Sequence, residues 1–180
     1  MDIVNPYFRT KDSEAELGKA DIRLICSEYA NTNLDIPALP QELYTITDDQ
    51  SLRCILDIGG DDRGAMALGR IAPAILEEND FEMLFVVNQY RPLTRDADSA
   101  IEVMREIEAA CGIPFTGIIN NSNLGVETTA DDVLRTVPYT QEIAEKSGVP
   151  VRMTTVENAL YPLLDGQIDD LFGISLQSKL

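Results

Sequence analysis

The sequence predicts an α/β protein with a mostly parallel sheet that is covered by helices on both faces. Short apolar segments, typical of buried strands, alternate along the chain with segments of helical periodicity, and this alternation favours parallel strands joined by helical crossovers. The chain has 180 residues, of which 44% are hydrophobic, which is enough for one domain with a substantial core. We expect a single domain over residues 1–165 and a weakly patterned tail over residues 166–180.

Five apolar segments predict the strands of this sheet, because a strand buried on both faces has a short continuous run of apolar residues. These are residues 22–26, 54–58, 83–87, 116–120 and 149–154. The predicted helices lie before, between and after them. They are a helix beginning near residue 13, residues 63–76, residues 101–111, a helix beginning at Thr128 or Thr129, residues 140–147 and residues 160–164.

Several of these helices carry their own start or stop signals. Ser13 and Glu16 have the spacing of a capping box, and Asp131 and Asp132 favour a helix start after Thr128 or Thr129 through the helix dipole. Gly112 and Gly148 are natural helix ends. Within the predicted helix over residues 63–76, Pro73 is expected to produce a kink or an end.

Composition excludes several classes of function. The net charge is -17, and the 14 Lys and Arg residues are scattered, so direct binding to nucleic acid or to an anionic membrane is not expected. The absence of histidine excludes His-based triads and His-ligated zinc. The three cysteines, Cys26, Cys54 and Cys111, have apolar neighbours and predict reduced core thiols in a cytoplasmic protein. The sequence contains no apolar run long enough to span a bilayer.

The strongest candidate for chemistry follows the apolar run of residues 54–58. Asp57 stands at the end of this run and Gly59 and Gly60 come next. At the carboxyl end of a parallel strand, a carboxylate can hold a metal ion through water, and glycines let the backbone approach a phosphate. The alternative is an ordinary strand-to-helix turn with a solvated acid.

A phosphate loop is missing, since no Gly-x-x-x-x-Gly-Lys-Ser/Thr occurs in the sequence. Gly59 and Gly64 have the glycine spacing of such a loop, but Ala65 and Met66 follow them where Lys and Ser or Thr are required. Asp61 and Asp62 in the intervening segment would also repel a phosphate. We therefore interpret residues 59–64 as a turn.

Two further loops carry polar side chains directly after predicted strands. In residues 88–95, Arg91 or Arg95 is placed to reach a phosphate; the alternative is that Thr94 caps the next helix and both arginines are surface charges. In residues 117–125, asparagines follow the strand, and their amides suit the edge of a purine base. Here the alternative is a turn, which asparagine also favours. The asparagines are Asn120, Asn121 and Asn123.

Near the start of the chain, Asp2 is a candidate to orient an attacking water. The alternative is an exposed N-terminal acid. The physical properties of the sequence leave both open.

Four segments, in this order, resemble the ParA/MinD/CobQ-type P-loop ATPases, and the resemblance extends from Asp2 to about Asn158. They are residues 2–9, which resemble the segment after the family's second strand, residues 57–60, which resemble its Walker B and switch region, and residues 87–94 and 120–125. None of the four is specific alone.

The resemblance implies a P-loop NTPase-like fold with ATP and Mg²⁺ as cofactors. By position, Asp57 would hold Mg²⁺ through water, Asp2 would position the hydrolytic water, and Asn120 would contact adenine. Gly59, Gly60 and Asn121 would lie beside the nucleotide. Members of the family usually act as ATP-sandwiched homodimers that switch protein partners on hydrolysis.

The chain departs from this family at its beginning. The family starts with a strand, the phosphate loop and a helix, whereas this chain begins at the end of the second strand, so we expect a truncated or misplaced start. Because the phosphate loop supplies most of the groups that neutralise the triphosphate, this chain is expected to bind ATP weakly or not at all.

Three functions remain open from the sequence. The first is an ATP-binding and ATP-hydrolysing switch when complete, inactive in this form. The second is a non-catalytic interaction module on the same fold, and the third is an ATP-dependent amide-forming or carboxylating synthetase of the same superfamily. The protein partner is not identified by any of them.

Overall fold

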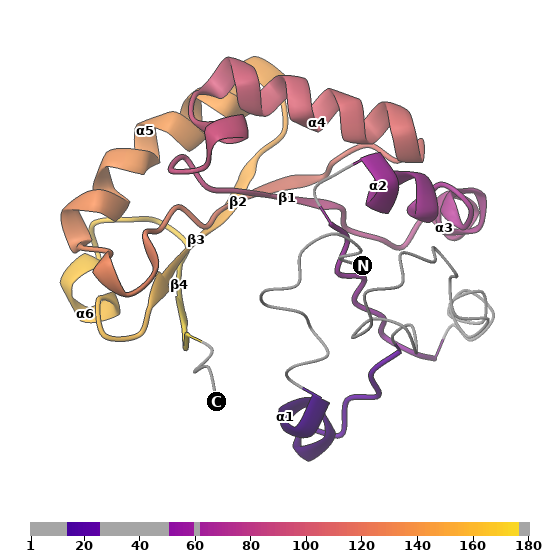
Figure 1. Cartoon of the computed structure of the whole chain (residues 1–180), viewed down its shortest axis with the longest axis horizontal. Coiled ribbons are helices and arrows are strands. Elements are labelled where there is room, and N and C mark those ends of the chain that lie inside the picture. The colour runs from indigo at the N-terminus through magenta and orange to yellow at the C-terminus, as the bar shows by residue number, and fades with distance from the viewer. Residues whose placement is uncertain (1–13, 26–50, 60–61, 177–180) are drawn as a thin grey trace. The chain divides into compact units, whose positions relative to one another are not determined.

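The computed structural model describes residues 14–25, 51–59 and 62–176 (Figure 1). The chain divides into two compact units. One comprises Met1–Phe81 and Ala109–Ile113, and the other comprises Glu82–Glu108 and Pro114–Leu180. Among the described residues, no helix is both long enough and apolar enough to cross a membrane.

The second unit is built on a parallel sheet. Its strands are β1 (Leu84–Val87), β2 (Gly117–Asn120), β3 (Val151–Glu157) and β4 (Leu171–Ile174). All three strand pairs are parallel, and the order in the sheet is β1-β2-β3-β4. The α/β character and the strands expected near residues 83–87, 116–120 and 149–154 are thus confirmed. The strand β4 was not predicted, since it lies in the segment interpreted as a weakly patterned tail.

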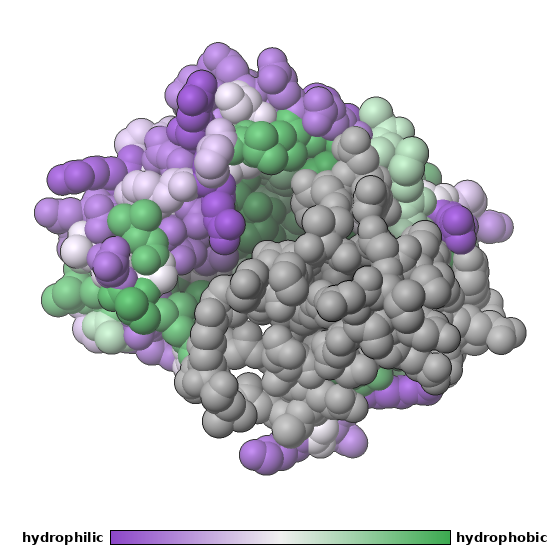
Figure 2. All heavy atoms as spheres, viewed as in Figure 1, coloured by the Kyte–Doolittle hydropathy of each residue, from purple (hydrophilic) through white to green (hydrophobic). Residues whose placement is uncertain are grey.

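The helices of this unit are α4 (Ala97–Cys111, of which the last three residues belong to the other unit), α5 (Ala130–Ser147) and α6 (Tyr161–Leu164). When consecutive parallel strands are added in one direction, right-handed crossovers place all connecting helices on the same face of the sheet. Figure 1 shows α4 and α5 on the same side of the sheet. The visible outer surface over these two helices is mainly hydrophilic (Figure 2).

The core of the second unit lies between this face of the sheet and its helices. One apolar cluster joins Val133 of α5, Val156 of β3, and Leu164 and Ile168 in and after α6. On the opposite face, Val86 and Phe172 are each 55% exposed. The described helices of this unit therefore cover one face of the sheet, where the sequence predicted helices on both.

Strands β2 and β3 are joined with an irregular register. Ile118 pairs with Val151 but Ile119 pairs with Met153, so Arg152 is the extra residue of a bulge. A Cβ atom at Gly117 would collide with the side chain of Arg152 and lie 3.0 Å from Leu84 Cδ2. Because residue 117 has no side chain, the Arg152 side chain can lie over β2 at this position.

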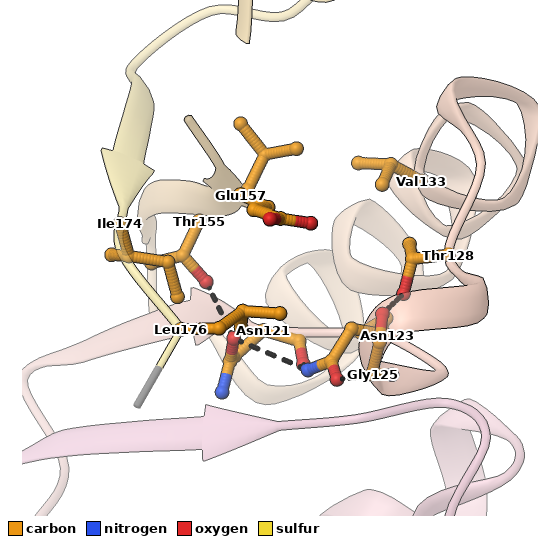
Figure 3. A pocket seen from close by; sticks show the side chains of 11 residues that line it. Asn121, Asn123, Gly125, Thr128, Val133, Thr155, Glu157, Ile174 and Leu176 are labelled. Carbon is orange, nitrogen blue, oxygen red and sulfur yellow. Dashed lines mark hydrogen bonds between the residues drawn. The ribbon is translucent and has the colours of Figure 1, made fainter. Parts of the chain in front are cut away.

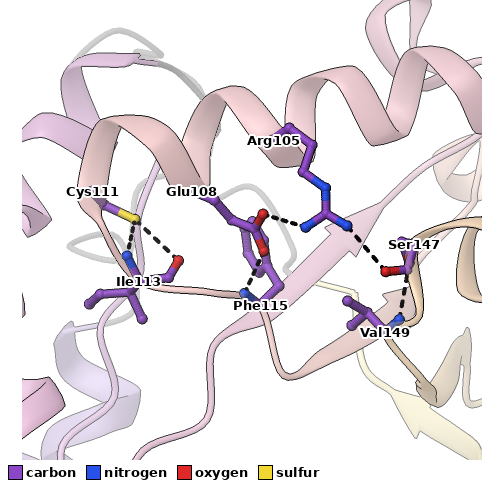
Figure 4. Close-up of polar contacts among 7 residues, drawn as sticks. All are labelled: Arg105, Glu108, Cys111, Ile113, Phe115, Ser147 and Val149. Atoms are coloured by element: carbon purple, nitrogen blue, oxygen red, sulfur yellow. Dashed lines mark hydrogen bonds and ion pairs between the residues drawn. The ribbon is translucent and has the colours of Figure 1, made fainter.

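A polar network anchors the two long helices to the loops that precede β2 and β3 (Figure 4). The Glu108 carboxylate accepts a hydrogen bond from the backbone N–H of Phe115 (2.9 Å) and pairs with Arg105 (2.5 Å). The same guanidinium donates to the carbonyl of Ser147 at the end of α5 (3.1 Å). These contacts fix where β2 begins relative to α4.

Helix α5 begins and ends as the sequence indicates, but it is one helix. Thr129 and Asp132 form a capping box at its start, and Gly148 ends it with a φ of 77°. The prediction of a separate helix over residues 140–147 was wrong. Pro138 lies inside the continuous helix, and burial of Thr136 and Tyr139 on either side of it offsets the hydrogen bond that its missing N–H costs.

The first unit contains α1 (Glu14–Lys19), α2 (Asp62–Leu68) and α3 (Ala72–Glu78). The single helix expected over residues 63–76 is instead two helices. Pro73 lies in the first turn of α3, where its missing N–H has no partner to lose. The Ser13 part of the predicted capping box lies outside the described residues.

The strands expected at residues 22–26 and 54–58 are not formed in the described residues. Residues 22–25 and 52–59 have irregular backbone, and Ile55 is 95% exposed. A strand requires a neighbour with which to exchange ladder hydrogen bonds, and an apolar run does not supply one. Of the three predicted core thiols, Cys111 is buried, Cys54 is exposed and Cys26 lies outside the described residues.

Candidate functional site

The loops that follow β1, β2 and β3 lie at one edge of the sheet, because parallel strands all end on the same side. The loop after β1 contains a short 3-10 helix, η3 (Pro92–Thr94), and the loop after β2 contains another, η4 (Gly125–Glu127). Ligands of open α/β sheets bind at this edge. It is therefore the place to look for a site.

The first two loops are interlocked by side chains. The Asn88 amide donates to the carbonyl of Asn123 (3.1 Å), and its oxygen accepts from the N–H groups of Asn123 (3.3 Å) and Tyr90 (3.0 Å). The N–H of Gln89 donates to the hydroxyl of Ser122 (3.0 Å). Both loops thus form one platform, and the Asn88 side chain is fully used in building it.

Two tyrosines tie the same platform to α5. The Tyr90 hydroxyl donates to the carbonyl of Asp132 (2.8 Å), and the Tyr139 hydroxyl donates to the carbonyl of Thr94 (2.6 Å). Burial raises the pKa of Tyr139 to about 12, and desolvation, with a smaller contribution from the Asp132 charge, raises the pKa of Tyr90. Both phenols are therefore neutral donors at physiological pH.

The side chain of Asn120 faces the interior. It is 0% exposed, donates to the hydroxyl of Thr136 in α5 (2.9 Å) and accepts from the N–H of Ser122 (3.2 Å). A group enclosed in this way fixes the exit of β2 and does not face solvent. The predicted contact of Asn120 with adenine stays a prediction, and the geometry favours the neighbouring Asn121 for any ligand contact.

A small cleft opens beside this platform, between the end of β3, the loop after β2 and the start of α5 (Figure 3). Its enclosed part has a volume of about 20 Å³, which is room for little more than one water molecule. The lining residues come from four elements of the second unit. They are Asn121, Ser122, Asn123, Gly125, Thr128, Val133, Thr155, Val156, Glu157, Ile174 and Leu176.

Most polar groups of the cleft are used by the protein itself. The Asn121 oxygen accepts from the Thr155 hydroxyl (2.7 Å), and the Asn123 amide donates to the Asn121 carbonyl (2.8 Å) while its oxygen accepts from Gly125 N–H (3.0 Å). The Thr128 hydroxyl accepts from Leu124 N–H (2.8 Å). The loop is thus held in shape by its own side chains.

Two polar groups of the cleft are not used in this way. Glu157 is half-buried at the end of β3, and its carboxylate lies between Val133 and the loop after β2 (Figure 3). Within residues 14–25, 51–59 and 62–176, neither this carboxylate nor the amide nitrogen of Asn121 has a hydrogen-bond or ion-pair partner. These are the groups with which the cleft can contact a ligand.

The other predicted site residues lie elsewhere. Asp57 and Gly59 belong to the first unit, where Asp57 is exposed on an irregular segment and does not end a buried strand. Asp2 and Gly60 lie outside the described residues. Asn120 and Asn121 are consecutive residues, and the side chain of Asn120 is enclosed in the core while Asn121 lines the cleft.

The described residues do not provide a metal site by themselves. No group of three or more His, Cys, Asp or Glu side chains in the described part of the chain is arranged to hold a metal ion. The Mg²⁺ that the family resemblance implies would need only one or two carboxylates beside the phosphates, so its site stays a prediction.

For residues 88–95, the structure confirms the alternative interpretation that both arginines are on the surface, but it contradicts the cap at Thr94. Arg91 is exposed, and Arg95 is exposed with its guanidinium 3.4 Å from Asp96. The cap of α4 is Asp96, whose carboxylate accepts from the N–H of Ser99 (2.8 Å), and this bond lowers the pKa of Asp96. The Thr94 hydroxyl instead donates to the carbonyl of Asn88 (2.7 Å), so the suggestion that Thr94 caps this helix was wrong.

Thr155 and Glu157 were not predicted as site residues. The strand predicted over residues 149–154 ends too early, since β3 continues to Glu157. A signal was present: Glu157 and Asn158 are the first charged and amide residues after the alternating Met153–Val156 stretch, which is the pattern expected where a strand reaches the edge of a sheet.

Comparison with protein-family models found no match to this chain, and comparisons with curated proteins and with solved structures found none either. The resemblance to the ParA/MinD-type ATPases therefore stays a prediction from the sequence.

Proposed function

We propose that the chain is a nucleotide-binding protein of the ParA/MinD type and that its second unit holds the base of ATP. The observation that carries this proposal is the cleft at the carboxyl edge of the parallel sheet, built mainly by the loop after β2 and the ends of β3 and β4 and braced by the loop after β1. Nucleotides bind at this edge in open α/β sheets.

The chemistry of the cleft suits a flat heteroaromatic ring. Val133, Val156, Ile174 and Leu176 supply apolar walls, and Glu157 and Asn121 supply a hydrogen-bond acceptor and a donor. A purine has apolar faces and a polar edge, which are the two kinds of surface offered here. The enclosed volume admits only the edge of such a ring, so its body would stand at the mouth of the cleft.

The sequence offers no comparable set of binding groups for the phosphates. The sequence contains no phosphate loop, and the net charge of -17 opposes a triphosphate. We infer that binding by this chain comes from the base and is weak, with a Kd of about 1 mM. ATP hydrolysis by members of the family requires a phosphate loop, and in that reaction the resemblance would give Asp2 the hydrolytic water and Asp57 the Mg²⁺.

The test is a titration of the ¹⁵N-labelled 180-residue chain with AMP, with ribose 5-phosphate as the ligand that lacks a base. AMP is expected to shift the amide resonances of residues 121–128 and 155–157, and ribose 5-phosphate to leave them unchanged. Equal shifts with both ligands, or no shift with AMP at several millimolar, would contradict the proposal.

A matched pair of variants locates the binding. Leu176→Asp places a charge on an apolar wall of the cleft, whereas Leu163→Asp places one on α6, where the leucine is also exposed and does not line the cleft. We expect Leu176→Asp to weaken AMP binding about tenfold or more and Leu163→Asp to leave it unchanged. Equal effects of both changes would place the base elsewhere.

A further inference from the structure

We propose that Glu157 selects the base, by accepting a hydrogen bond from the 6-amino group of an adenine ring at the mouth of the cleft. This inference rests on the proposed function, since it concerns the same cleft. Glu157 would determine specificity, and the 6-amino group of adenine would be the ligand group that it recognises.

The Glu157 carboxylate is partly buried and, within the described part of the chain, has no partner that compensates for this burial. A carboxylate accepts hydrogen bonds and donates none, and one that is half-buried is partly removed from water. It has no hydrogen-bond or ion-pair partner among the described residues. Such a group lacks compensation for its lost hydration, so a ligand that brings an N–H donor gains more here than it would at the surface.

Apart from Asn121, the asparagines of the two loops are not available to contact the base. The side chain of Asn88 is fully used in joining the two loops, the side chain of Asn123 bonds within its own loop, and Asn120 is enclosed in the core. The residues that most resemble base-reading side chains in the sequence are thus occupied in the structure. Glu157 is left as the acceptor of the cleft, with the Asn121 amide nitrogen as a donor near its rim.

The lining of the cleft suits the amino group of a purine better than a metal ion or a sugar. A metal ion would need more oxygen ligands than the described residues gather, and the apolar walls do not suit a sugar. Adenine carries its N–H donors on the 6-amino group, whereas guanine has an acceptor oxygen at the same position. A carboxylate facing that position favours adenine and repels guanine.

The experiment compares three ligands and four proteins. The ligands are AMP, GMP and purine riboside 5′-monophosphate, which lacks the amino group of AMP but keeps the ring, the ribose and the phosphate. The proteins are the unchanged chain, Glu157→Ala and Glu157→Gln, and Glu145→Ala on the exposed face of α5 is the control. Affinities come from the same resonance shifts as above, and the spectra also show that each variant is folded.

The unchanged chain and Glu145→Ala are expected to bind AMP about tenfold more tightly than the ligand without the amino group, as expected for a hydrogen bond to a charged acceptor. This ratio should fall to about one in Glu157→Ala. In Glu157→Gln it should be intermediate, because the amide oxygen still accepts but carries no charge. A residue that only shaped the cleft would weaken both ligands equally and leave the ratio unchanged.

Three results would overturn the inference. A ratio near one in the unchanged chain, or a ratio that survives in Glu157→Ala, would remove Glu157 from base selection while leaving AMP binding, and hence the proposed function, intact. Tighter binding of GMP than of AMP would assign the carboxylate to the N–H edge of guanine instead. Absence of AMP binding would overturn the proposed function itself, and the inference with it.

Discussion

The amide of Asn120 donates a hydrogen bond to the hydroxyl of Thr136, 2.9 Å away, and so joins the end of β2 to the middle of α5. Both residues are fully buried. The Asn120 oxygen in turn accepts from the N–H of Ser122, where the loop of the cleft begins. The position of that loop therefore depends on a polar contact inside the core.

The first prediction concerns this contact. Thr136→Val keeps the shape of the side chain but leaves the Asn120 amide without its partner, and we expect the free energy of unfolding in urea to fall by about 1–3 kcal/mol. Thr140→Val is the matched control. Thr140 is a buried threonine of the same helix whose hydroxyl bonds only to backbone carbonyls of its own helix, so its loss should be clearly smaller. Equal losses would mean that the Asn120 contact contributes nothing of its own.

The second prediction concerns the interlocked loops. Asn88→Ala removes the bonds to the N–H and the carbonyl of Asn123 and to the N–H of Tyr90. We expect amide hydrogen exchange of Asn123 and Tyr90 to become about tenfold faster or more, since each such bond contributes about 1 kcal/mol. Asn158→Ala, which removes a single exposed bond to Ser175, is the control. Unchanged exchange at Asn123 would show that the two loops hold their shape separately.

The third prediction is a dependence of stability on alkaline pH. Burial raises the pKa of Tyr139 from 10.0 in the unfolded chain to about 12 in the folded protein. The unfolded state therefore releases this proton first, and the stability contributed by the neutral phenol is complete below pH 10 and is lost as the pH rises through about 12. The expected loss is at most about 1.4 kcal/mol per pH unit in that window.

Tyr139→Phe provides the test of this dependence. It should cost about 1 kcal/mol at pH 7 through loss of the bond to Thr94, and it should make unfolding in urea less sensitive to pH between 10 and 12 than in the unchanged chain. The other tyrosines and the lysines titrate in both proteins, so the difference reports Tyr139. Parallel pH profiles would contradict the assignment.

The fourth prediction concerns Gly117. An added methyl group would collide with Arg152 and crowd Leu84, so Gly117→Ala should lower the unfolding free energy by about 1–3 kcal/mol. The double change Gly117→Ala with Arg152→Ala should recover most of this loss, because it removes the colliding side chain. Additive effects of the two changes would show that the loss does not come from the collision with Arg152.

The sequence predicted the second unit well and the first unit poorly, for a physical reason. In the second unit, apolar strands alternate with helices that carry local signals, as in the capping box of Thr129 and the glycine at position 148. These signals act within a few residues and are readable from sequence. Residues 54–58 have the composition of a strand, but strand formation depends on a neighbouring chain, which composition does not reveal.

The sequence indicated where the candidate site lies but not which side chains face the cleft. The asparagines after β2 do lie at the edge of the sheet, as their position after an apolar run indicates. Which of them faces solvent depends on the alternation of side chains across β2, and this places Asn120 in the core beside Thr136. Glu157 was missed because the end of a strand is fixed by its pairing partner β4, which was itself not predicted.

The reciprocal bonds between Asn88 and Asn123 also constrain how this protein can diverge. These bonds use the side chain of Asn88 but only the backbone of Asn123, so a change at position 88 leaves polar backbone groups without a partner, whereas a change at position 123 keeps this contact. Libraries that aim to redirect ligand choice should therefore keep Asn88 constant and can randomise position 123.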